Sequence, residues 1–165
     1  MQTSSLDLWD VIAEEASAES PLWAEALRPD AERDRRPVFS ALLADSRYAV
    51  GVETIYEGYL LHYGRPRLFA PADAHTALLL GDYLYAHGLV RIAAAESVEA
   101  VADLAGLISI CAQLRAEGLD GDGEAWAATA ALLGERPLVT SRNAREVADA
   151  EAVQRALAIH REHVG

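Results

Sequence analysis

The stretch "GYLLHYGRPRL", Gly58–Leu68, is where the longest predicted helix of the chain ends and the chain turns. Apolar residues at helical spacing run up to His62. Gly64 and Pro66 then stop the helix, because glycine just past a helix end and proline soon after it are typical of helix termination. The stretch has no acidic residue, although the chain has 26. An acid-free corner in an acidic chain is therefore the feature to explain.

The sequence on both sides of this corner also predicts helices, since Ala, Leu, Glu and Arg dominate and β-branched runs are scarce. Local signals mark helix starts at Ser5, Pro21, Ser97 and Ser141 and a helix end at Gly118. The expected helices cover residues 6–18, 21–27, 37–63, 71–95, 97–117, 124–133 and 141–163. The expected fold is all-α, an antiparallel helical bundle that forms one domain over residues 1–165.

Charge and cysteine content narrow the class of protein. The formal net charge is −12, from 14 basic residues, all arginine, and 26 acidic ones. This charge argues against nucleic acid or an anionic membrane surface as a partner. The longest uncharged run, Leu104–Leu114, is too short to span a membrane, and no secretory leader is visible. The single Cys111 excludes an intramolecular disulfide and a zinc site of several thiolates, so we expect a reduced, cytoplasmic setting.

Two pairs of side chains lie at a spacing that suits metal binding. Glu53 and Glu57 are four residues apart on one helix face, where paired carboxylates bind divalent cations or act as acid and base. A solvent-exposed pair is the favoured interpretation, because acids are rarely buried. His160 and His163 are one turn apart, but no third ligand is evident, and a favourable interaction with the helix dipole explains them as well. No metal site is predicted from either pair.

Two other features have simple structural interpretations. Asp120 and Asp122 in "LDGDG" resemble the start of a calcium loop, but the glutamate that such a loop needs at its twelfth position is Ala131 here. A glycine-containing loop is the better interpretation. Cys111 lies among apolar residues, which indicates a core position.

A cluster of arginines, Arg33, Arg35 and Arg36, precedes Pro37, where a helix is predicted to begin. Guanidinium groups bind phosphate well, and a helix N-terminus attracts anions. Acidic residues alternate with these arginines, however, and on composition alone they favour ion pairs within the cluster.

Four stretches occur in the order and spacing of a known family. They are "ERDRRP" at 32–37, "VETIYEGYLLH" at 52–62, "LLLGDYLYAHGL" at 78–89 and "WAATAALLG" at 126–134. Together they resemble the trans-type polyprenyl diphosphate synthases, the all-helical isoprenoid synthase family. The resemblance spans about residues 32–134 and implies a truncated form of the isoprenoid synthase fold.

The resemblance also implies roles for single residues. The family holds one diphosphate with a lysine, an arginine and a histidine, and the residues at these positions here are Arg33, Arg36 and Tyr56. All three donate hydrogen bonds, so a residual diphosphate-binding site is expected from them. Other helix positions that match the family are Glu53, His62 and Asp82.

Both aspartate-rich motifs with which the family binds magnesium are missing. The first should directly follow His62, where Tyr63 and Gly64 stand, and the C-terminal "ADAEAVQRALAIHREHVG" does not reproduce the second. Magnesium held by carboxylates must neutralise the leaving diphosphate in such enzymes. The resemblance therefore implies a degenerate member with no catalytic residues, no metal site and no cofactor.

The function that follows is that of a non-catalytic, polyprenyl-synthase-like protein, a scaffold or regulatory subunit in isoprenoid metabolism. Its expected partners are a second copy of itself or a prenyl synthase, because a shortened fold exposes apolar surface that marks contact sites. Two alternatives stay open. One is an active prenyltransferase with a rearranged site, which requires magnesium, and the other is a carrier of an apolar prenyl-type ligand.

Overall fold

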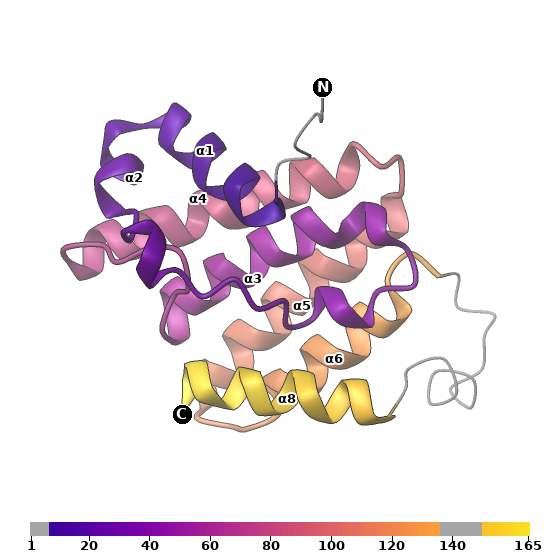
Figure 1. Ribbon diagram of the computed structural model, residues 1–165. Coiled ribbons are helices and arrows are strands. Elements are labelled where there is room, and N and C mark those ends of the chain that lie inside the picture. Colours follow the sequence, from indigo (N-terminus) through magenta and orange to yellow (C-terminus); the bar gives the residue numbers. More distant parts are fainter. Residues whose placement is uncertain (1–6, 136–149) are drawn as a thin grey trace.

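The computed structural model describes residues 7–135 and 150–165, and the regular structure in them is helical (Figure 1). The α-helices are α1 (Leu8–Glu19), α2 (Pro21–Ala26), α3 (Ala49–Tyr63), α4 (Ala74–Ala93), α5 (Val98–Glu117), α6 (Asp122–Leu132) and α8 (Ala150–Val164). Three short 3-10 turns, η1 (Asp30–Glu32), η2 (Ser40–Leu42) and η3 (Ser46–Tyr48), connect α2 to α3. These ranges contain no strand, only one isolated bridge between Leu27 and Phe69, and no helix long and apolar enough to cross a membrane. The all-α prediction is confirmed.

Helix α3 lies at the centre of the fold. In Figure 1 it crosses the middle of the molecule, with α1 and α2 above it, α4 and α5 behind it and α6 and α8 below it. Its residues 51–61 form an unbroken buried run. Every face of α3, including the one that carries its two glutamates, therefore meets protein rather than water.

Glycines set the close packing of α3 against α4. A Cβ added to Gly88 would lie 2.4 Å from Cγ1 of Ile55, and one added to Gly58 would lie 2.9 Å from the carbonyl oxygen of Gly81. Gly51 lies against Gly88 in the same way. Because Gly51 meets Gly88 while Gly58 meets Gly81, the two helices run in opposite directions.

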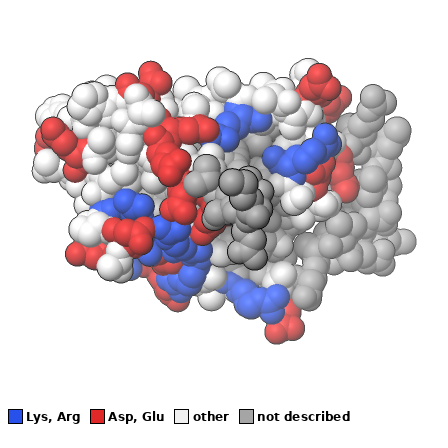
Figure 2. Space-filling view, turned by 45° about the horizontal axis from the view of Figure 1, so that its top comes forward, with Lys and Arg blue, Asp and Glu red and all other residues white. Residues whose placement is uncertain are grey.

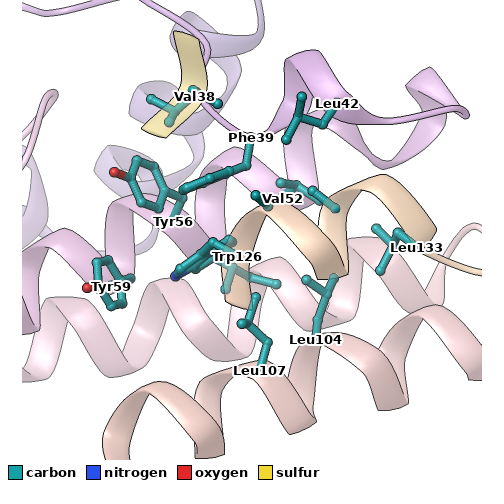
Figure 3. Close-up of a cluster of buried hydrophobic side chains, with 14 of the residues drawn as sticks. Val38, Phe39, Leu42, Val52, Tyr56, Tyr59, Leu104, Leu107, Trp126 and Leu133 are labelled. Atoms are coloured by element: carbon teal, nitrogen blue, oxygen red, sulfur yellow. The ribbon is translucent and has the colours of Figure 1, made fainter. Parts of the chain in front are cut away.

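Two groups of buried side chains form the core. The larger one, shown in Figure 3, joins α3, α5 and α6 to the segment before α3. Its centre is aromatic, since Phe39 stacks on Trp126 with a centroid distance of 5.3 Å and meets Tyr56 edge-on at 5.1 Å. The smaller group lies between α1, α3 and α4 and includes Trp9, Leu80 and Leu84. An aromatic pair like those that Phe39 forms stabilises a fold by about 1 kcal/mol beyond the contribution of the buried area.

Several helix ends lie where local sequence signals predict them. The side chain of Ser97 accepts a hydrogen bond from the Ala100 amide at the start of α5. Pro21 is the first residue of α2. Gly118 follows α5 with φ 66°, the left-handed conformation that glycine adopts without strain. These three predictions are confirmed.

The predicted helix over 37–63 is wrong over residues 37–48, because the α-helix begins only at Ala49. Residues before Ala49 form 3-10 turns instead. The amides of Val38 and Ser40 bond to the side chain of Glu53 and not to a helical carbonyl. Asp45 in turn bonds the Arg47 amide, a local contact that competes with helix formation. Arg36 consequently does not precede a helix N-terminus.

The remaining boundaries differ by a few residues. Helix α4 begins at Ala74 rather than at residue 71, because Asp73 accepts a hydrogen bond from the Thr76 amide and so caps it. Helix α6 begins at Asp122, two residues earlier than predicted. The predicted caps Ser5 and Ser141 lie outside the described residues.

Candidate functional site

The two carboxylates of α3, Glu53 and Glu57, have no exposed surface. The prediction of a solvent-exposed pair is wrong, because the segment before α3 and the corner after α3 cover this face of the helix. Arg67 of the acid-free corner is also fully buried and ion-pairs with both carboxylates.

Arg67 binds the carboxylates and two aromatic rings at once. Its Nη1 donates to Glu53 at 2.7 Å and its Nε donates to Glu57 at 3.1 Å. The guanidinium carbon lies 4.7 Å from the ring centre of Trp9 and 4.9 Å from that of Tyr56. Guanidinium groups suit this environment, since they are weakly hydrated and stack on aromatic faces.

Backbone amides complete the hydrogen bonding of the two carboxylates. Oε1 of Glu53 accepts from the amides of Val38 and Ser40 at 3.0 and 3.1 Å, and Oε1 of Glu57 accepts from the amide of Leu68 at 2.7 Å. With the bonds from the guanidinium, all four carboxylate oxygens are engaged. The cluster thus ties the segment before α3 and the corner after α3 to the same helix.

A second arginine of the corner holds α8. The Arg65 amide donates to the His163 carbonyl oxygen at 2.9 Å, and the Arg65 guanidinium donates to the carbonyl oxygen of Glu162. The Nδ1 atom of His163 lies 3.2 Å from the Arg65 carbonyl oxygen. The corner therefore caps the last turn of α8, whose carbonyl groups have no partner within the helix.

A surface cavity of about 340 Å³ lies beside this cap. Its walls carry nearly equal numbers of opposite charges, from Arg28, Glu32, Asp34, Arg36, Arg65, Arg67 and Glu162, with His163 among them. Figure 2 likewise shows basic and acidic side chains interleaved on the face that it presents. The forked contact with Arg36 holds the pKa of Asp34 below its ordinary value. An added anion would have to compete with these carboxylates for the arginines.

The three residues expected to hold a diphosphate bind other groups. Arg33 donates to the carbonyl oxygen of Arg28 and pairs with Asp30. Arg36 pairs with Asp34 and Glu162. The pairs of Arg33 with Asp30 and of Arg36 with Asp34 are the ion pairs within the cluster that composition favours, whereas Glu162 belongs to α8.

Tyr56 lies in the interior. Its hydroxyl group is 2.9 Å from Nδ1 of His160, and burial raises its pKa. The structure therefore does not place the Tyr56 hydroxyl in the surface cavity that Arg36 lines.

The other two family-matching residues are brought together. Nε2 of His62, on α3, lies 3.2 Å from Oδ1 of Asp82, on α4. The imidazole stacks on Tyr85 at 5.0 Å and lies directly against Gly81. Burial lowers the pKa of His62 although Asp82 acts against this shift. The contact joins the two most closely packed helices.

Asp122 belongs to a network of side chains rather than to a calcium loop. Its Oδ2 accepts hydrogen bonds from the Tyr59 hydroxyl and from the Arg115 guanidinium. Burial acts to raise the pKa of Asp122, but these hydrogen bonds keep it below its ordinary value. The network lines a second cavity, of about 300 Å³, which Asp120 also borders.

Cys111 is buried as predicted, and burial raises the pKa of its thiol to about 12. His160 and His163 face different groups, since Nε2 of His160 lies 3.8 Å from Asp122 while Nε2 of His163 lies 3.5 Å from Asp34. Within residues 7–135 and 150–165, no three His, Cys, Asp or Glu side chains are grouped so that they could hold a metal ion.

Sequence reasoning missed Arg67, the residue on which the α3 cluster depends. One signal was present. A corner of two arginines without any acid follows a helix that carries two acids at a spacing of four, so the charges of the two stretches are complementary.

No family model, curated protein or solved structure matches this chain. The function is therefore inferred from the geometry above and from the resemblance over residues 32–134.

Proposed function

We propose that the chain is a non-catalytic helical protein with a truncated isoprenoid-synthase-like bundle, and that it acts as a scaffold or regulatory subunit in isoprenoid metabolism. The observation that carries the proposal is the position of Arg67. The corner that would hold metal-binding aspartates in the resembling family here supplies a cation to the interior of the protein.

Chemistry explains why this position matters. Ionisation of an allylic diphosphate requires magnesium held by carboxylate oxygens. The carboxylates that α3 offers, Glu53 and Glu57, already accept five hydrogen bonds on their four oxygens. They stabilise the fold around α3, and a metal ion could bind them only if those bonds were broken.

A scaffold also needs a surface for its partner, and we assign this role to the outer face of α4 and α5. These helices pack against each other and lie behind α3 in Figure 1. The large apolar side chains of this pair that are more than half exposed are Leu78, Leu79, Val90, Val98 and Ile110. The middle of α5 adds exposed small residues, Ala102, Ala105, Gly106 and Ser109.

The charge pattern favours an apolar helical partner for this face. Residues 104–114 of α5 carry no charge, and Asp82 is the single acidic residue between positions 74 and 90. The net charge of the whole chain is −12, so two copies repel each other least where their contacting surfaces carry few acidic side chains. Small side chains let a second helix approach closely. The partner is thus a helical chain with a similar face, either a second copy or a prenyl synthase.

Two measurements on the purified full-length protein test the proposal. The first incubates it with an allylic diphosphate, isopentenyl diphosphate and magnesium. No prenyl product is expected, and turnover abolished by chelation would overturn the non-catalytic part.

The second measurement determines molar mass by light scattering, alone and with a prenyl synthase from the same host. We expect a dimer or a mixed complex, which Ile110→Arg should disrupt. The matched control is Leu22→Arg, which alters an exposed leucine on α2 and should leave the mass unchanged. A monomer that binds no synthase would overturn the scaffold part.

A further inference from the structure

Helix α8 is docked through two buried histidines one turn apart. His160 and His163 have exposed fractions of 3% and 8%. Each touches elements other than α8 through Nδ1, His160 at the Tyr56 hydroxyl and His163 at the Arg65 carbonyl oxygen. Neither Nε2 atom has a hydrogen-bond partner in the described structure. An interface that depends on neutral imidazoles changes when they gain a proton.

The carboxylate that faces His160 already has a cationic partner. Asp122 lies 3.8 Å from Nε2 of His160, but the same carboxylate binds Arg115 and the Tyr59 hydroxyl. The titratable or charged groups around His160 are Tyr56 and Tyr59 from α3, Arg115 from α5, Asp122 and Glu124 from α6 and Arg161 from α8.

The surroundings of His163 follow the same pattern. Asp34 lies 3.5 Å from Nε2 of His163 and is held in a forked pair by Arg36. The charged groups around this imidazole are Arg28, Glu32, Asp34 and Arg36 from the segment after α2, Arg65 and Arg67 from the corner, and Glu162 from α8. A proton on His163 would add a positive charge near several guanidinium groups.

The docked helix covers aromatic side chains. The His160 ring lies 5.6–5.9 Å from the rings of Phe39, Tyr56 and Tyr59, which belong to the cluster of Figure 3 together with Trp126. Leu157 of α8 joins the same cluster. Loss of α8 would therefore expose an aromatic surface that is buried in the structure.

We infer that α8 is an acid-released latch: protonation of His160 and His163 undocks the helix and exposes the aromatic cluster beneath it. This inference does not depend on the proposed function, since it concerns how one helix is held. It identifies a conformational switch that mild acid operates.

The direction of the pH effect follows from the two imidazoles. Burial lowers the pKa of both, with Asp122 opposing the shift at His160 and the charge of Arg67 adding to it at His163. A base whose pKa falls on docking is protonated mainly in the undocked state. The docking free energy is therefore fully present above the ordinary histidine pKa of about 6.5 and is lost as pH falls below it. At pH 5.5 each histidine can shift the equilibrium up to about tenfold.

Hydrogen exchange of the full-length protein at pH 7.5 and 5.5, corrected for intrinsic rates, tests the latch. Peptides from residues 150–165 should exchange faster at pH 5.5, by up to about a hundredfold for the two histidines together, whereas peptides from α4 should keep their protection. The double variant His160→Asn, His163→Asn places an amide where each Nδ1 lies, and it does not titrate. It should keep α8 protected at pH 5.5, while the exposed-pair control His87→Asn should behave like the parent.

Three results would overturn the inference. They are α8 protection that persists at pH 5.0, simultaneous loss of protection in α8 and α4, and a double variant as acid-sensitive as the parent. If α8 of the double variant is already unprotected at pH 7.5, the pH dependence of α8 exchange in the parent protein alone tests the inference. The midpoint of its α8 release must then lie below 6.5 and above the carboxylate range near 4.3.

Discussion

Replacing Arg67 by methionine should destabilise the protein severely. The change removes the ion pairs to Glu53 and Glu57, at 2.7 and 3.1 Å, and the stacking on Trp9 and Tyr56. It leaves two carboxylates without a cation in a site with no exposed surface. Removal of one partner of a buried ion pair typically costs about 3–5 kcal/mol. That is a large share of the roughly 5–15 kcal/mol that stabilises a domain.

Urea unfolding followed by circular dichroism measures the cost. For a slope of about 2 kcal/mol/M, the midpoint should fall by about 2 M. The control is the triple variant Arg67→Met, Glu53→Gln, Glu57→Gln. Its amide oxygens still accept from the backbone, and no charge is stranded, so it should regain at least half of the loss. The reasoning fails if the single variant loses less than about 1 kcal/mol, or if the triple variant is no more stable than the single one.

Three further substitutions test how closely α3 packs against α4 and how α8 is held. Gly88→Ala should lower the free energy of unfolding in urea by about 1–3 kcal/mol, because its Cβ would lie 2.4 Å from Ile55. Gly106→Ala, whose Cβ meets no atom of this chain within 4 Å, should instead raise that free energy by about 0.5–1 kcal/mol. Equal effects at both sites would contradict this packing. Arg65→Ala should speed hydrogen exchange in residues 150–165 and leave exchange in α4 unchanged, because it removes the side-chain contact to the last turn of α8. Unchanged exchange in α8 would show that this contact does not hold the helix.

The features of the fold that the sequence predicted are those set by residues close to one another along the chain. Ser97 and Gly118 act within one turn of their own helix, so their effect is visible in the sequence. The segment from residue 37 to residue 48 was predicted as helix because its apolar spacing allows one. Its amides are bonded by Glu53, which lies about fifteen residues away along the chain. Such a contact has no local sequence pattern, so the prediction failed there.

The same distinction explains the candidate site. The spacing of Glu53 and Glu57 was visible in the sequence, but their exposure depends on what covers α3. Buried acids are uncommon, so frequency alone favoured an exposed pair, and that prediction was wrong because both carboxylates are buried. The two acids can be buried because the guanidinium of Arg67 neutralises their charge. That contact forms only when the corner after α3 folds back onto the helix, so it is a property of the tertiary structure.

The corner after α3 has no room for a metal site built simply by placing an aspartate at Gly64. A Cβ at Gly64 would lie 2.7 Å from the carbonyl oxygen of His163 and 3.1 Å from a side-chain carbon of Val164. An aspartate there would therefore strike the last turn of α8. Gly64→Asp should speed hydrogen exchange in residues 150–165, and magnesium should not raise its melting temperature. A protected α8, or a melting temperature that rises with magnesium, would show that the corner retains room for the ion and that α8 does not exclude it.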